Sequence, residues 1–140
     1  YMTLTQSVTD TIVQHLISKI GSLELLYLFG SQAQGTADLN SDVDLAYHSI
    51  AKLSSTERYE LAQELACLLN TDVDLIDLDT AGEVLRKEAV LKGHLIYGDT
   101  NLSDEYAVRV MRDYQDHKYR VKDIEAMIFE GEAHARSVHK

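Results

Sequence analysis

The stretch LFGSQAQGTADLNSDVDLAY, residues 28–47, places a Gly-Ser pair directly after an apolar run and two aspartates on the next run. The apolar residues LELLYLF at 23–29 predict a buried strand that ends at Gly30. The following DVDLAYH at 42–48 alternates acidic and apolar residues, which is the period of a strand with two different faces. On such a strand Asp42 and Asp44 lie on the same face, where their charges repel each other unless a cation lies between them. The pattern therefore predicts a cation site.

The same local pattern, DVDL, recurs within DVDLIDLD at 72–79. If the two strands are neighbours, Asp74 joins Asp42 and Asp44 in one cluster. Hard cations such as Mg²⁺ take carboxylate oxygens and keep water or substrate phosphate in their remaining positions. Three such acids are typical of sites that transfer phosphate groups with metal ions. The sequence thus indicates Asp42, Asp44 and Asp74 as metal ligands.

The Gly30-Ser31 pair between the strands is suited to a phosphate group. Glycine lets the backbone turn sharply and approach a ligand closely, and free N–H groups together with the Ser31 hydroxyl can hold phosphate oxygens. The pair is not a P-loop, because no Gly-Lys-Ser/Thr follows it. A calcium loop starting at Asp38 is also excluded, since its sixth and twelfth positions hold Val43 and Ser49 instead of glycine and glutamate.

Hydrophobic periodicity along the whole chain predicts a mixed α/β (α+β) fold, a small sheet flanked by helices. Ser54 and Glu57 form a capping-box pattern at the start of one helix. The last helix is long and amphipathic, and we expect a break near His117-Lys118. The predicted elements are helices at 5–20, 54–70, 80–93 and 103–129, and strands at 23–29, 42–48, 72–79 and 94–98.

Composition narrows the classes of function. The 140 residues carry a net charge of -10, with 6 Lys and Arg against 15 Asp and Glu in residues 1–100. This balance argues against direct binding to nucleic acid, which depends on basic side chains. No apolar run is long enough for a membrane span or a signal peptide, so we expect a cytoplasmic protein. The single cysteine, Cys67, excludes an internal disulfide, and its apolar neighbours predict a buried position.

Gly30-Ser31, ten intervening residues and Asp42-x-Asp44 together resemble the GS-x10-DxD signature of the DNA polymerase beta nucleotidyltransferase superfamily. The short length and the order of elements resemble its minimal nucleotidyltransferase (MNT) branch, over roughly residues 5–98. More narrowly, the chain is similar to MNT antitoxins that are paired in bacteria with a HEPN-domain ribonuclease toxin. The resemblance implies a nucleotidyltransferase domain at 1–100 and a helical extension at 101–140 that packs on it or on a partner.

The same resemblance implies an activity and a role for each site residue. The antitoxin would transfer AMP from ATP to a tyrosine of the HEPN toxin, its protein partner, and so neutralise it. Gly30 and Ser31 would hold the nucleotide phosphates, Asp42 and Asp44 would bind Mg²⁺, and Asp74 would be the third acid, which assists deprotonation of the attacking hydroxyl. Positioning and charge neutralisation are also what phosphoryl transfer needs on physical grounds.

One departure from the family pattern leaves alternatives open. Many relatives read GSRARG after the strand, whereas this chain has Gln32 and Gln34 in place of the arginines. A cation from the helix at 80–93 could replace them, and the candidates are Arg86, Lys87 and Lys92. If none does, the alternative is a non-catalytic antitoxin that masks the toxin by binding.

The pattern Arg112-x4-His117-x-Tyr119 also resembles a motif of the HEPN ribonucleases. Because Arg112 and His117 are five residues apart, a helix does not place them well on one face. We therefore expect a structural or partner-contact role for this segment.

Overall fold

The computed structural model describes residues 5–30 and 42–138, with side chains up to residue 128. The order of elements is the one that the sequence predicts, with boundaries that differ by a few residues and by more at the end of α5. The helices are α1 (Gln6–Lys19), α3 (Ser55–Leu69), α4 (Glu83–Lys92) and α5 (Thr100–Val138). The strands are β1 (Leu23–Phe29), β2 (Val43–Ser49), β3 (Val73–Asp77) and β4 (His94–Gly98).

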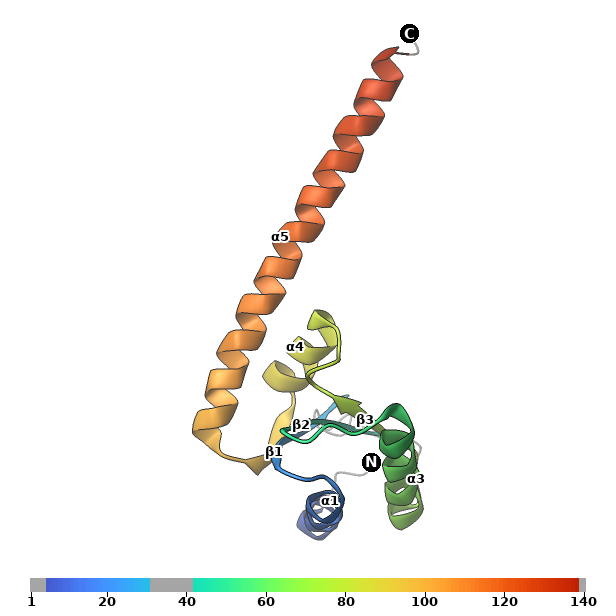
Figure 1. Ribbon diagram of the computed structural model, residues 1–140, viewed down its shortest axis with the longest axis vertical. Coiled ribbons are helices and arrows are strands. Elements are labelled where there is room, and N and C mark those ends of the chain that lie inside the picture. The colour runs from blue at the N-terminus through green and yellow to red at the C-terminus, as the bar shows by residue number, and fades with distance from the viewer. Residues whose placement is uncertain (1–4, 31–41, 139–140) are drawn as a thin grey trace.

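The four strands form one mixed sheet in the order β3-β2-β1-β4. β1 pairs antiparallel with β2 and with β4, whereas β2 and β3 run parallel. Helices cover both faces, α1 and α3 on one side and α4 and α5 on the other (Figure 1). The central strand β1 is buried along almost its whole length, which explains why its sequence is continuously apolar.

Each face of the sheet has its own apolar core. In the first core, Leu16 of α1 and Leu65 of α3 are fully buried against Leu45 and neighbouring strand residues. In the second, Val90 of α4 and Val110 of α5 pack on the opposite face. Two cores in a small domain fix the sheet firmly, so the ends of its strands are well-defined positions for functional side chains.

The helix α3 confirms one local prediction and corrects another. The Ser54 Oγ accepts from the Glu57 backbone N–H at 3.1 Å, and the Ser54 N–H donates to Glu57 Oε1 at 2.9 Å, so the capping box is present. Cys67, however, is exposed. Leu61 and Leu65 define the buried face of the helix, and Cys67 follows Leu65 by two positions, which turns it away from the sheet.

The long helix α5 is continuous from Thr100 to Val138, so the expected break near His117-Lys118 is wrong. His117 and Arg120 both lie beside the Glu83 carboxylate of α4, at 3.8 Å and 3.9 Å, and neither proline nor glycine interrupts this turn. Beyond this contact the helix extends away from the body (Figure 1), and Ile124, Met127 and Ile128 are exposed. No helix in residues 5–30 or 42–138 is long and apolar enough to cross a membrane.

Candidate active site

The predicted acids come together at one end of the sheet. In the parallel pair β2–β3, Asp44 and Asp74 are directly opposite each other, and Phe29 of β1 is the partner of Asp44 on the other side. Asp44 is two residues before Ala46 on β2, so both side chains lie on the same face of the sheet. Ala46 is buried under α4 and α5. Asp44 and Asp74 therefore lie on the face of the sheet that these two helices cover, and Asp42 precedes β2 at the same end.

The charges of these carboxylates are not compensated by basic side chains. The pKa of Asp44 is raised, first by burial and then by the charges of Asp74 and Asp42. Asp42 and Asp74 are exposed, and within the described segments no Lys or Arg forms an ion pair with any of the three acids. The cluster is thus a place where the protein maintains mutual repulsion, which a bound cation would relieve.

The backbone at Gly30 is shaped around one of these acids. Gly30 has a positive φ of 74°, a conformation that residues with a Cβ rarely adopt. A Cβ built at this position would overlap the Asp44 carboxylate. Glycine here therefore allows this backbone conformation and leaves the space that the Asp44 side chain occupies. Ser31, the other predicted phosphate ligand, lies outside the described residues.

The donor set fits Mg²⁺ better than a transition metal, because it consists of carboxylate oxygens alone. In residues 5–30 and 42–128, no three His, Cys, Asp or Glu side chains are gathered into a ready-made metal cage. Mg²⁺ does not require such a cage, because proteins bind it through one or two carboxylates completed by water and substrate phosphates. Asp42 and Asp44, with Asp74 alongside, suit an ion that is bound together with a nucleotide.

The three basic candidates for phosphate binding make other contacts. The Arg86 guanidinium donates to the carbonyls of Leu78 at 2.7 Å and Ala81 at 2.8 Å, and it thereby fixes the connection between β3 and α4. Lys87 lies over the Tyr114 ring, and Lys92 pairs with Glu88 one turn earlier. Arg86 therefore stabilises the fold through these hydrogen bonds. The contacts of Lys87 and Lys92 are of a kind that contributes little to the free energy of folding.

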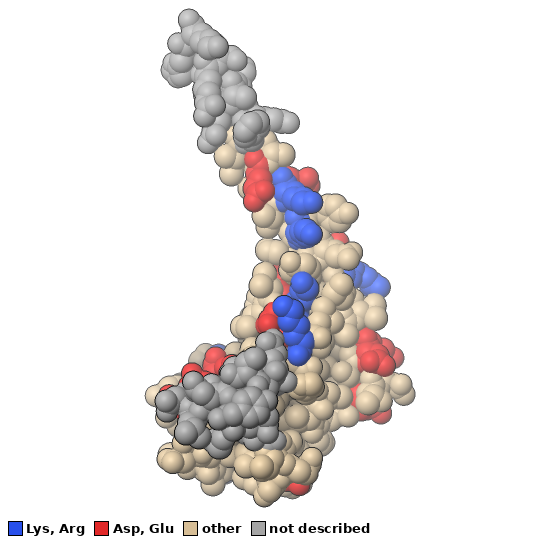
Figure 2. Space-filling model, turned by 180° about the vertical axis from the view of Figure 1, so that it is seen from behind, with Lys and Arg blue, Asp and Glu red and all other residues tan. Residues whose placement is uncertain are grey.

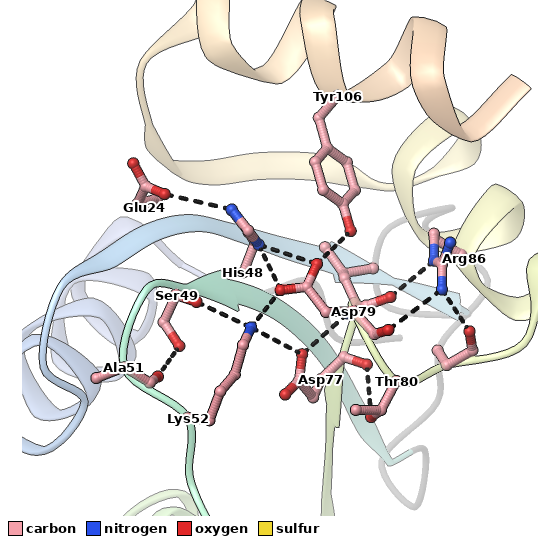
Figure 3. Close-up of polar contacts among 12 residues, drawn as sticks. Glu24, His48, Ser49, Ala51, Lys52, Asp77, Asp79, Thr80, Arg86 and Tyr106 are labelled. Carbon is pink, nitrogen blue, oxygen red and sulfur yellow. Dashed lines mark hydrogen bonds and ion pairs between the residues drawn. The ribbon is translucent and has the colours of Figure 1, made fainter. Parts of the chain in front are cut away.

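A second polar cluster, at the opposite end of β2, was not predicted from the sequence (Figure 3). His48 lies between Glu24, at 3.2 Å, and Asp79, at 2.9 Å. Asp79 also pairs with Lys52 and accepts a hydrogen bond from the Tyr106 hydroxyl at 3.1 Å. The cluster joins β2, the β3–α4 connection and α5. Its partners are as far as 31 residues apart in the sequence, so no local pattern indicates it.

Replacing Asp79 with asparagine will destabilise the protein by roughly 2 kcal/mol at pH 7, the magnitude of lost hydrogen bonds to a charged group. Although burial raises the pKa of Asp79, its contacts with Lys52, His48 and Tyr106 outweigh this effect and lower it. Its contribution is therefore present above the unfolded pKa, about 3.9, and is lost as the pH falls through the lower folded pKa.

Chemical denaturation of the wild type and of Asp79→Asn at several pH values measures this contribution. We expect a constant difference between pH 5 and 7 that shrinks below about pH 4. Asp116→Asn, which removes an exposed carboxylate from α5, is the control and will stay within about 0.5 kcal/mol of the wild type. A difference that grows toward low pH would contradict the assignment.

Comparison with known proteins now identifies the family. Residues 11–102 match the family described as polymerase beta, nucleotidyltransferase. The chain belongs to the polymerase beta nucleotidyltransferase family. The family membership that the Gly-Ser and Asp-x-Asp spacing predicted is confirmed, and so is the nucleotidyltransferase fold.

Similar members of this nucleotidyltransferase family come from toxin–antitoxin pairs. The chain is 41% identical to protein adenylyltransferase MntA of Shewanella oneidensis over 106 aligned residues. The alignment covers 76% of each of the two chains. A crystal structure of a toxin–antitoxin with AMP-PNP aligns with a TM-score of 0.81 and 36% identity, over 86% of this chain and 98% of the other. A structure of the tri-AMPylated Shewanella oneidensis HEPN toxin with its MNT antitoxin aligns with a TM-score of 0.77 and 32% identity. This alignment covers 90% of this chain and 99% of the other.

Proposed function

We propose that this nucleotidyltransferase is a protein adenylyltransferase antitoxin, which transfers AMP from ATP to a tyrosine of a HEPN ribonuclease toxin and so neutralises it. The observation that carries the proposal is the pairing of Asp44 with Asp74 beside Gly30, in a chain that is 41% identical to protein adenylyltransferase MntA. The AMP-PNP in a similar toxin–antitoxin structure supports ATP as the donor, because AMP-PNP is an analogue of ATP.

Asp42 and Asp44 would hold Mg²⁺, which supplies positive charge to the phosphates when it is bound. Gly30 and Ser31 would hold phosphate oxygens through their backbone N–H groups and the Ser31 hydroxyl. Asp74 is exposed, so an acceptor from another protein can reach it. It would accept the proton of the tyrosine hydroxyl while the hydroxyl oxygen bonds to the α-phosphorus. The bond from that phosphorus to the pyrophosphate oxygen breaks, and pyrophosphate leaves.

The distribution of charge suits a protein acceptor. The acidic first hundred residues disfavour nucleic acid as a direct partner and attract a basic protein surface. Basic side chains are spread along α5 with acidic ones between them (Figure 2). We assign the chemistry to residues 1–100 and contact with the toxin to 101–140, where exposed apolar residues continue the face that packs on α4. We place the reaction in the cytoplasm.

Labelled ATP tests the proposed reaction. With purified toxin, label at the α-phosphate will be transferred to the toxin, and label at the γ-phosphate will appear in pyrophosphate. Removal of divalent ions with EDTA will stop the transfer, and excess Mg²⁺ will restore it. Transfer of the γ-label would show a kinase instead, and neutralised toxin without any label would favour the masking antitoxin.

A further inference from the structure

A groove of about 550 Å³ runs along the outer side of β3, between α3 and the start of α4. All five residues of β3 line it, together with Arg58 and Tyr59 from α3 and Leu85 from α4. Tyr59 is 66% exposed and Leu85 is 41% exposed, although both residues are apolar enough to favour burial. Figure 1 shows β3 with α3 on one side and α4 on the other. The groove therefore combines an open strand with aromatic and aliphatic walls.

On this side, the backbone N–H and C=O groups of β3 are not paired with any described strand. Among the described strands, β3 has a single neighbour, β2. Asp72 accepts from the Val43 N–H and the Leu78 N–H donates to Tyr47, both at 2.9 Å, so the even-numbered positions face β2. In a parallel pair the alternate residues direct their N–H and C=O groups the other way. Val73 and Leu75 thus present backbone groups to the groove, which is the arrangement that accepts an added strand.

The groove also includes Asp74, a residue of the proposed active site. Asp74 lines it and is at the same time the register partner of Asp44. Asp44 and Gly30 lie on the inner side of Asp74, where the nucleotide would be held, so the open side is left for the acceptor. A residue on an added strand opposite Asp74 would have its side chain on the same face of the sheet, about 5 Å away at the Cβ atoms.

We propose that the groove along β3 binds the tyrosine-bearing segment of the acceptor protein in an extended conformation, paired with the edge of β3. The tyrosine side chain lies next to Asp74, and flanking residues of the segment pack on Tyr59 and Leu85. Arg58 also lines the groove and can donate a hydrogen bond to an oxygen atom of the segment. The inference rests on the proposed function, and it adds the place and the backbone conformation of the acceptor.

Kinetics of Tyr59→Ala test this inference, with Leu68→Ala as the matched control. Leu68 is on the same helix and is 56% exposed, but it does not line the groove. We expect Tyr59→Ala to raise the KM for the toxin about tenfold while the KM for ATP stays within about twofold, because tyrosine is among the residues whose truncation at the centre of an interface weakens binding this much or more. Leu68→Ala will match the wild type in both constants. An unchanged KM for the toxin, or a raised KM for ATP instead, would overturn the inference.

A photo-crosslinking amino acid separates this inference from the proposed function. Placed at position 59, it will crosslink to one tyrosine-containing peptide of the toxin, which is the modified peptide wherever AMP is transferred, and placed at position 68 it will not. This readout needs binding only, so it stands even if wild-type protein transfers no AMP. Transfer by the wild type without crosslinks at position 59 would refute the groove and leave the activity intact.

Discussion

Replacing Asp44 with asparagine will reduce AMP transfer about a thousandfold, the upper end of the range for loss of one group that stabilises a transition state. The variant keeps the shape of the side chain but loses the charge that would hold Mg²⁺ beside the nucleotide. Asp42→Asn is expected to act in the same direction. Initial rates with toxin and ATP at saturating concentrations measure the effect, with Asp10→Asn on α1 as a distant control that retains full activity.

The melting temperature of Asp44→Asn tests whether unfolding causes the loss of AMP transfer. Burial and the charges of Asp74 and Asp42 raise the pKa of Asp44, so its ionised form destabilises the fold above that pKa. Asparagine removes this repulsion, and the melting temperature at pH 7 will equal or exceed that of the wild type. A clearly lower melting temperature would mean that Asp44 supports the structure and not the chemistry.

Gly30→Ala is the second change with a large expected effect. The added methyl group overlaps the Asp44 carboxylate, and the positive φ is unfavourable for alanine. We expect a loss of roughly 2 to 4 kcal/mol in the free energy of unfolding, from strain of about 1 kcal/mol and overpacking of about 1 to 3 kcal/mol. AMP transfer will fall about a hundredfold, because small displacements of a catalytic group have effects of this size.

Gly21→Ala is the matched control for this substitution. A Cβ at Gly21 meets only the Ala51 Cβ at 3.5 Å, an ordinary contact. The free energy of unfolding and the initial rate will therefore differ between the two variants. Both values of Gly21→Ala will be close to those of the wild type. Equal behaviour of the two variants would show that the space beside Asp44 has no importance.

Sequence patterns predicted the sheet because β1, buried on both faces, is continuously apolar, whereas the segments of β2 and β3 alternate acidic and apolar residues. The repeated DVDL predicted that Asp44 and Asp74 would meet, and the parallel pairing of β2 and β3 places them opposite each other. The roles of the three acids in catalysis and metal binding are still predictions, and so is phosphate binding by Gly30 and Ser31.

Features that depend on long-range packing were not predictable in the same way. The close approach of Gly30 to Asp44 depends on the pairing of β1 with β2, which no local pattern specifies. The cluster around Asp79 and the continuity of α5 past His117 arise from contacts between distant segments. Cys67 was misjudged because apolar neighbours in the sequence do not reveal which side of a helix faces the sheet.

The central claim is that this chain transfers AMP to a protein, and the mass of the intact toxin tests it most directly. The cognate toxin is incubated with the wild-type chain, ATP and Mg²⁺, and its mass is then determined. The account predicts a gain of one or more AMP units that depends on ATP. A toxin that is bound and inhibited but keeps its original mass would contradict the account and establish a masking antitoxin.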